Sequence, residues 1–405
     1  MRSVIRRCFV LSACFCIVFL VGCPPSLGGW TRTFGGTDSD LAASVWQTSD
    51  GGYVLAGFTR SSGAGEHDVF LVKTNALGTS EWQQTFGGAH DDLAYAVQQT
   101  TDGGYIVAGV TSSFGVGMED VYLVKTDAAG AEVWTRTFGG EQADGALAVR
   151  QTLDGGYIVA GTTASLSNGP NDIYLIRLDG DGGPVWGKAL DVQGDSDCAY
   201  AVQQTLDGGF IVAGMAERVP DGPEPGLSDM GLIKTDASGN VEWKKMFGGD
   251  DWDIARAVEQ TSDGGYIVAG VTKSFGAGEV DGYVVRTDGA GTELWSRTYG
   301  GAANDWFFSA QETSDGGIIL AGATRELPDV GITDLYLVRT DADGVIQWWR
   351  SHGGSDNDVA YSVRQTTDGG YILGGSTRSY GAGEYDMYLV KTDSTGGVIT
   401  PIPVE

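Results

Sequence analysis

The sequence contains little cysteine outside its N-terminus, and this scarcity excludes a disulfide-stabilised fold. Of five cysteines, Cys8, Cys14, Cys16 and Cys23 lie within the N-terminal segment. Cys198 is alone in the rest of the chain, so no intramolecular disulfide can form there. It takes a repeat position that leucine, isoleucine or valine fills in four other copies, which predicts a small buried side chain rather than a reactive thiol.

Basic residues are also scarce. The chain has 25 Lys and Arg against 53 Asp and Glu, a net charge of −28. Without Arg2, Arg6 and Arg7, which precede an N-terminal apolar run, 22 basic residues remain and the net charge is −31. A nucleic acid partner is excluded, because a phosphate backbone needs a basic footprint. Divalent cations, cationic partners or solubility in salt are left as explanations of the charge.

Recognisable catalytic motifs are absent as well. The three histidines, His67, His90 and His352, show no metal-ligand spacing. No segment matches a nucleophile or phosphate-binding motif. Carboxylates are abundant, and a glycosidase pair is defined by its spatial separation rather than by sequence. We therefore expect a noncatalytic protein, with a carboxylate-dependent enzyme as the alternative.

A long apolar run occurs at the N-terminus. Residues 8–21 are apolar, follow the three arginines and are too few for a comfortable transmembrane helix, which predicts an export signal over residues 1–22. Leu20-Val21-Gly22-Cys23 resembles the lipobox of bacterial lipoproteins. The resemblance implies a lipid on Cys23, a tether over residues 23–29, and anchorage to a bacterial membrane facing the periplasm or the cell exterior. An ordinary signal peptide that contains a cysteine is the alternative.

Glycine, by contrast, is plentiful and marks a repeat. The 65 glycines follow no collagen-like period, and with 41% hydrophobic residues the chain is too apolar for disorder. Asp-Gly-Gly recurs with its aspartate at Asp50, Asp102, Asp154, Asp207, Asp263, Asp315 and Asp368. Tryptophan recurs in step at Trp30, Trp82, Trp134, Trp186, Trp243, Trp295 and Trp348. A period near 50 residues is typical of β-propellers rather than helical solenoids.

Each repeat predicts four short strands. In the second copy they cover residues 94–100, 105–108, 121–125 and 133–138, with Asp102-Gly103-Gly104 as the first hairpin turn. Four strands in each of seven repeats predict an all-β fold, a closed seven-bladed β-propeller. The seventh copy lacks its fourth strand, whereas residues 30–34 form a fourth strand with no repeat before it. We expect this N-terminal strand to pair with residues 385–390 and complete the last blade, giving a propeller over residues 30–400 and a tail over 401–405.

The repeat resembles a known family through the run Asp120 to Asp127, Trp134, the Gly139-Gly140 pair, Asp144 and the run Asp154 to Tyr157. It is similar to the bacterial and archaeal β-propeller repeat family, and distantly to quinoprotein propellers, although the spacing from aspartate to glycine is one residue shorter here. The resemblance implies the propeller fold from Trp30 to about Gly397. It implies no specific function, because such repeats occur on extracytoplasmic proteins of mostly unassigned role.

Two aspartate series recur in all seven copies and are expected on one face of the disc. The first is Asp40, Asp92, Asp144, Asp197, Asp253, Asp305 and Asp358. The second is Asp68, Asp120, Asp172, Asp229, Asp281, Asp334 and Asp386. We expect them to accept hydrogen bonds from turn amides and to pair with the cations of the third strands, Lys73, Lys125, Arg177, Lys234, Arg286, Arg339 and Lys391. A ring of cation sites is the alternative.

Acidic departures from the repeat fall on loops of blades three to five. They are Asp191, Asp195, Asp221, Glu224, Asp250 and Asp251. These carboxylates are the candidate metal ligands, because calcium prefers oxygen ligands, although they lack the spacing of a recognised calcium loop. The alternative is a solvated acidic rim that binds no metal, and we favour this alternative.

Aromatic departures supply the candidate ligand contacts. Trp306, Phe307 and Phe308 follow directly on Asp305, and Trp252 lies in the loop before the fifth blade. Exposed aromatics at a propeller mouth can stack on a sugar or hold a peptide. Strand alternation predicts that at least one of the three consecutive side chains is buried.

The sequence therefore predicts a monomeric, noncatalytic binding or scaffold module for a protein, peptide or glycan. No cofactor is expected, with calcium as the open alternative. The alternative function is an extracytoplasmic enzyme, either carbohydrate-active or a quinoprotein-like oxidoreductase. The quinoprotein resemblance implies calcium and a quinone in the central channel.

Overall fold

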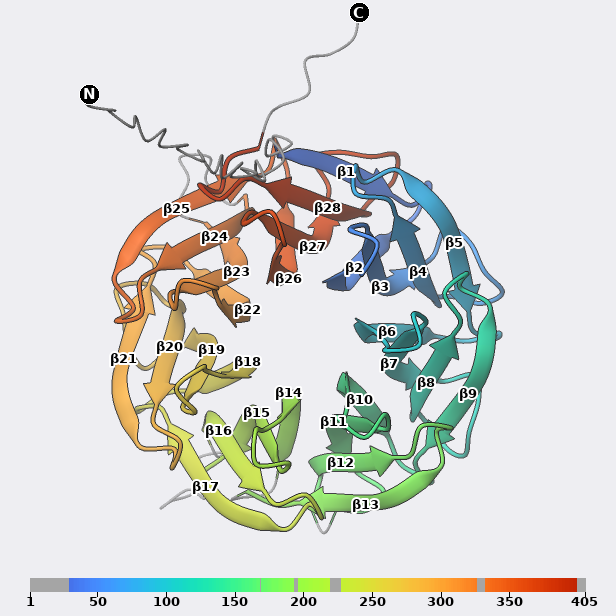
Figure 1. The fold of residues 1–405 in the computed structure, drawn as a ribbon, viewed down its shortest axis with the longest axis horizontal. Helices are drawn as coiled ribbons and strands as arrows, with labels where there is room; N and C mark the ends of the chain where they lie inside the picture. The colour runs from blue at the N-terminus through green and yellow to red at the C-terminus, as the bar shows by residue number, and fades with distance from the viewer. Residues whose placement is uncertain (1–28, 168, 193–195, 219–226, 326–331, 399–405) are drawn as a thin grey trace, which may run out of the picture.

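The computed structural model describes residues 29–167, 169–192, 196–218, 227–325 and 332–398. Within these ranges the chain forms 28 strands, arranged as seven four-stranded antiparallel sheets. The sheets stand as blades around a common axis (Figure 1). The predicted closed seven-bladed β-propeller is confirmed.

Each blade presents one strand to the centre and one to the rim. The innermost strands are β2 (Asp40–Gln47), β6 (Asp92–Gln99), β10 (Asp144–Gln151), β14 (Asp197–Gln204), β18 (Asp253–Gln260), β22 (Asp305–Glu312) and β26 (Asp358–Gln365). The second strands are β3 (Tyr53–Thr59), β7 (Tyr105–Thr111), β11 (Tyr157–Thr163), β15 (Phe210–Glu217), β19 (Tyr266–Thr272), β23 (Ile318–Thr324) and β27 (Tyr371–Thr377). The third strands are β4 (Asp68–Thr74), β8 (Asp120–Thr126), β12 (Asp172–Leu178), β16 (Ser228–Thr235), β20 (Asp281–Thr287), β24 (Asp334–Thr340) and β28 (Asp386–Thr392). The outermost strands are β1 (Trp30–Phe34), β5 (Ser80–Phe86), β9 (Glu132–Phe138), β13 (Pro184–Leu190), β17 (Val241–Phe247), β21 (Glu293–Tyr299) and β25 (Ile346–His352).

The Asp-Gly-Gly turn joins the first two strands of each blade. In the second blade Gly103 has a φ of 85°, which glycine adopts without steric cost. The backbone N–H of Gly104 donates to Asp102 Oδ1 at 3.0 Å, and Lys125 Nζ of β8 lies 2.9 Å from Asp102 Oδ2. The third-strand cation of every blade pairs in this way with the turn aspartate.

This pairing corrects the partners predicted for the two aspartate series. The cation lies near the end of the third strand, whereas the series aspartates open the first and third strands, so the two groups lie at opposite faces of the disc. The series aspartates do accept turn amides, as predicted. Asp92 Oδ2 accepts the N–H of Gly88 at 2.7 Å, and Asp68 Oδ2 accepts the N–H of Ala64 at 2.8 Å.

Aromatic side chains pack neighbouring blades together. Trp82 of β5 meets Tyr105 of the next blade edge to face, with ring centroids 5.6 Å apart. The same contact recurs between Trp30 and Tyr53 at 5.8 Å. Tyr105 is 1% exposed and Tyr53 2% exposed, so these rings are core. The recurring aromatics therefore hold neighbouring blades together.

The N-terminal strand closes the ring. β1 pairs antiparallel with β28, with Trp30 opposite Lys391 and Phe34 opposite Met387. In Figure 1 the blue β1 accordingly lies beside the red β28. Closure through the last blade is therefore confirmed, because the fourth strand of that blade comes from the other end of the described chain.

Candidate functional site

A β-bulge in every innermost strand shapes the central channel. In β6 the register with β7 shifts between Ala94 and Ala96, which leaves Tyr95 unpaired, and the other six innermost strands shift at the same position. A bulge re-aims a side chain, here toward the axis. The seven bulge residues all line one cavity of about 190 Å³: Ala43, Tyr95, Leu147, Tyr200, Arg256, Phe308 and Tyr361. We call them the bulge layer.

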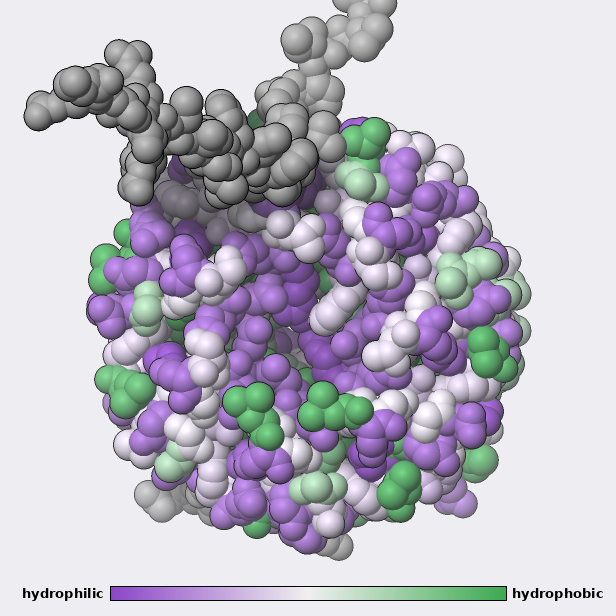
Figure 2. Space-filling view, in the orientation of Figure 1, coloured by the Kyte–Doolittle hydropathy of each residue, from purple (hydrophilic) through white to green (hydrophobic). Residues whose placement is uncertain are grey.

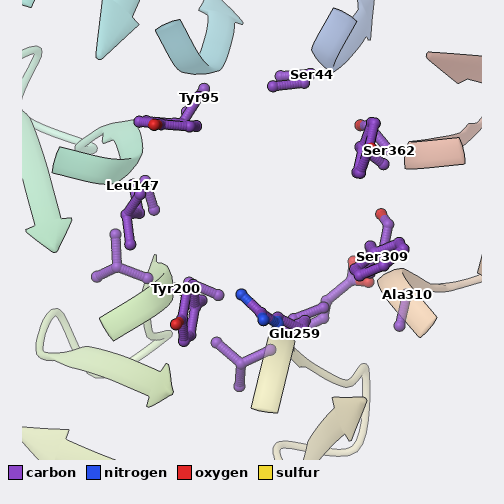
Figure 3. Close-up of a pocket in the computed structure, with 18 of the residues that line it drawn as sticks. Ser44, Tyr95, Leu147, Tyr200, Glu259, Ser309, Ala310 and Ser362 are labelled. Carbon is purple, nitrogen blue, oxygen red and sulfur yellow. The ribbon is translucent and has the colours of Figure 1, made fainter. Parts of the chain in front are cut away.

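The channel opens at the centre of the disc. Figure 2 shows a central hollow surrounded mainly by hydrophilic residues on the face in view. Figure 3 shows Tyr95, Leu147, Tyr200, Glu259 and the serines around one open space. The residues that line the space come from all seven blades.

Three residues after each bulge, the innermost strands contribute a second layer. Its members are Trp46, Gln98, Arg150, Gln203, Glu259, Gln311 and Arg364. Four of them join adjacent blades, because Gln98, Gln203, Glu259 and Gln311 each accept the backbone N–H of the next blade's strand at 2.7–2.8 Å. Trp46, Arg150 and Arg364 carry no acceptor that can replace this bond. These three residues therefore break a structural pattern, and the fold does not require them.

The departures bring positive charge into an acidic protein. Arg150, Arg256 and Arg364 line the cavity, and Glu259 is the single carboxylate among its lining residues, which leaves a net charge of +2. The guanidinium carbons of Arg150 and Arg364 lie 5.7 and 5.2 Å from the Trp46 ring centroid. That of Arg256 lies 4.0 Å from the Tyr200 ring centroid. Each guanidinium thus lies against an aromatic ring, an arrangement that orients the cation.

Burial shifts the pKa values of two channel arginines and of Glu259. Burial lowers the pKa of Arg150 to about 9, with a smaller contribution from the charge of Arg364 and opposition from Glu259. Burial also lowers the pKa of Arg364, and it raises the pKa of Glu259 against the opposing charge of Arg364. Arg150 stays charged at neutral pH because its pKa lies well above 7. The channel therefore holds poorly hydrated positive charge.

The predicted aromatic triplet is divided among three environments. Trp306 is half-buried near the mouth, with the guanidinium carbon of Arg325 5.3 Å from its ring. Phe308 belongs to the bulge layer and lies 5.4 Å from the ring of Tyr361. Phe307 is fully buried and stacks on Tyr336 at 5.8 Å, so it is a core residue rather than a ligand contact. Trp252 is half-buried in the loop before β18.

Of the six predicted acidic ligands, the structure describes Asp191, Asp250 and Asp251. Asp195, Asp221 and Glu224 lie outside the described residues. Asp250 and Asp251 belong to the loop before β18, where Asp251 Oδ2 lies 3.4 Å from Lys273 Nζ.

Asp191 instead joins two members of the aspartate series. Its carboxylate oxygen lies within 4.8 Å of those of Asp172 and Asp197. In the other six copies glycine occupies this position, where a Cβ would come within 2.8 Å of both series aspartates. Exposed acidic groups form such clusters without a cation, and Lys244 Nζ bonds the backbone carbonyl of Asp191.

The remaining cysteine does not belong to the channel. Cys198 is half-buried in β14 rather than fully buried as predicted. Burial raises the pKa of its thiol to about 11. A thiol with that pKa is almost entirely protonated at neutral pH, so it is unreactive, as expected.

Sequence reasoning missed the arginines of the channel. The signal was present in the aligned seventh residue of the innermost strands, where glutamine or glutamate occupies four copies and Arg150 and Arg364 occupy two. Arg256 was harder to find, because a period-two pattern does not reveal that a bulge turns the fourth residue toward the axis.

These observations define the class of protein, a closed seven-bladed β-propeller with a charged central channel. The chain is similar in structure to the Pan2 WD40 domain of Neurospora crassa, with a TM-score of 0.54, 11% identity, and coverage of 88% of this chain and 89% of that one. It is also similar to puromycin hydrolase, with a TM-score of 0.55, 14% identity, and coverage of 91% of this chain but 55% of that one. Likeness at these identities shows the fold alone.

Comparison of the sequence with known proteins does not assign the chain to a family within this class. No family model matches the chain, so membership of the bacterial and archaeal repeat family stays a prediction. The chain is 29% identical to the regulatory protein FlaEY of Caulobacter vibrioides over 132 residues, which cover 30% of this chain and 13% of that protein. The match therefore spans a small part of FlaEY.

Residues 1–28, with the predicted signal and Cys23, lie outside the described part of the chain. Among the described residues, no helix has the length and apolar character needed to span a bilayer.

Proposed function

We propose that this protein is a noncatalytic binding or scaffold propeller, exported and anchored to a bacterial membrane through lipid on Cys23. Its central channel receives part of a protein, peptide or glycan ligand. One observation carries this proposal. The second layer keeps its interblade hydrogen bond in four blades and gives it up in three, where Trp46, Arg150 and Arg364 converge on the channel.

The side chains of the channel favour binding over catalysis. Its lining contains neither histidine nor cysteine, and Glu259 is its one carboxylate among the described residues. A glycosidase site needs two carboxylates on either side of the scissile bond. Calcium prefers several oxygen ligands and is repelled by three arginines, so the lining does not suit the calcium and quinone that the quinoprotein resemblance implies.

Glycan and peptide arrays test the function with the purified chain from residue 24 onward. The triple variant Trp46→Gln, Arg150→Gln and Arg364→Gln gives all three positions the residue that other blades use, so we expect it to fold. The wild-type protein should retain a subset of the arrayed ligands and the triple variant should lose them. Arg136→Gln is the matched control, because Arg136 is exposed on β9 outside the channel. If the triple variant retained the same arrayed ligands as the wild-type protein, the binding site would lie outside the channel.

A further inference from the structure

Two sets of cations, the third-strand cations and the channel arginines, differ in their partners. In each of the seven third-strand cations, a side-chain nitrogen lies within 2.9 Å of an aspartate carboxylate oxygen. The channel arginines have no such ion pair among the described residues. Their charge is therefore compensated only partly, by the single carboxylate of Glu259.

One N–H group of each of two channel arginines lacks a hydrogen-bond acceptor in the described structure. Nε of Arg256 and Nε of Arg364 are buried and donate to no atom in the described structure. Arg150 Nη1 donates to the carbonyl oxygen of Val149 at 2.9 Å. A buried charged donor without an acceptor is costly, and such groups normally have partners. These two N–H groups can donate to an acceptor in the channel, and the excess positive charge of the lining favours an anionic one.

The geometry suits an oxyanion. Arg150 and Arg364 come from blades three and seven, yet both reach the ring of Trp46 in blade one. Guanidinium groups present parallel N–H donors that match the oxygens of carboxylate and phosphate. Tyr95, Tyr200 and Tyr361 line the same cavity in the bulge layer, where their rings can pack against the body of a ligand.

We propose that the central channel is an oxyanion site in which Arg150, Arg256 and Arg364 bind a carboxylate or phosphate group. The site rests on the proposed function, because it assigns a chemistry to the ligand of the channel. The cavity of about 190 Å³ admits a small oxyanion or the charged end of a longer ligand. Glu259 limits the affinity, because its negative charge opposes that of the ligand.

Glu259→Gln changes the charge alone. Glu259 Oε2 accepts the backbone N–H of Glu312 at 2.8 Å, and a glutamine carbonyl can accept the same bond, as Gln203 does from Gln260 at 2.7 Å. The substitution therefore raises the channel charge while it preserves the interblade contact. Arg150→Gln with Arg364→Gln lowers the charge by two and supplies the acceptor used in other blades.

The test is isothermal titration calorimetry at fixed ionic strength with phosphate, citrate and acetate as probes. We expect saturable binding by wild type, at least tenfold tighter binding by Glu259→Gln, and loss of binding by the double arginine variant. Arg136→Gln should match wild type. Circular dichroism and thermal melting confirm that each variant is folded.

A second arm distinguishes the source of the oxyanion. A short peptide with a free C-terminal carboxylate is compared with its C-terminal amide. Preference for the carboxylate over both the amide and the free ions assigns the site to the end of a longer ligand, whereas tighter binding of the free ions assigns it to a small molecule. No saturable binding by any oxyanion, or binding that both charge variants leave unchanged, overturns the proposal. If the arrays still show loss of ligand in the triple variant, the binding function stands without the oxyanion chemistry.

Discussion

At the scale of single residues, two channel arginines add positive charge where other blades have a stabilising interblade hydrogen bond. Where the second layer carries glutamine, an interblade hydrogen bond of 2.7 Å forms, as between Gln98 and the N–H of Gln151. Arg150 and Arg364 give up this bond and add buried positive charge. Residues that weaken a repeat and gather in one cavity indicate a functional site, because folding alone does not favour them.

Replacing both arginines by glutamine should therefore stabilise the protein. Each restored hydrogen bond contributes about 0.5–1.5 kcal/mol, so the double variant should gain about 1–3 kcal/mol in free energy of unfolding. Urea denaturation followed by tryptophan fluorescence measures the change. A lower stability than wild type would mean that the arginines hold the blades together.

At the scale of elements, the interface between β13 and β14 differs from the other six. Asp191 stands where glycine separates the two series aspartates elsewhere, and it places a third carboxylate beside Asp172 and Asp197. Asp172 is only 8% exposed, so part of this negative charge is withdrawn from water. Like charges at such a separation repel.

Asp191→Asn removes one charge with little change in shape. We expect a gain of about 0.5–1 kcal/mol in the free energy of unfolding when a chelator is present, since the repulsion is partly screened by solvent. Thermal melting at low salt measures it, with Asp38→Asn on another loop as the control.

Repeating both melts with millimolar calcium chloride tests the cation hypothesis. A site that uses these carboxylates raises the melting temperature of the wild-type protein by ligand linkage and leaves Asp191→Asn unchanged.

The strands and the closure of the ring were more predictable from the sequence than the residues that line the central channel. Four strands recur with turn signals in each repeat, so the blades and their closure through Trp30 were predictable. The side-chain partners were not, because strand direction puts Lys125 at the opposite face from Asp120, beside Asp102. Nor was the channel, since a bulge changes which residue of the innermost strand faces the axis, and Phe308 rather than Phe307 enters it.

At the scale of the whole molecule, the ring depends on contacts between blades that are distant in sequence. One of them repeats seven times, where the eighth residue of each innermost strand accepts the N–H of the turn in the preceding blade at 2.7–2.9 Å. Gln47 closes this set with Thr367. Blades one and seven are thus joined as the other neighbours are.

Deleting residues 30–36 should destabilise the entire ring rather than one end. Trp30 and Phe34 are each 8% exposed, and loss of a buried aromatic side chain costs about 3–5 kcal/mol, so the loss should exceed about 5 kcal/mol. Urea denaturation measures it, with deletion of residues 401–405 as the control. A small loss, confined to the last blade in hydrogen exchange, would show that closure is dispensable.

Replacing Cys23 by serine should release the protein from the membrane fraction. A lipid chain binds the bilayer through its buried methylene groups, and none is attached without the thiol. Fractionation of the producing cells measures the partition, with Cys16→Ser as the control. Unchanged partition of Cys23→Ser would exclude lipidation at this residue.

The closure strand also determines how the ring responds to mechanical load. Any pull transmitted through the residues before Trp30 reaches β1, the edge strand of its sheet, whose backbone ladder is formed with β28. The load enters at the Trp30–Lys391 pair and must open the ladder one pair at a time toward Phe34 and Met387. Opening in that order resembles a zipper and needs less force than sliding the whole strand. Under tension the last blade would therefore yield first, and the other six would lose their closed ring only after β1 had detached.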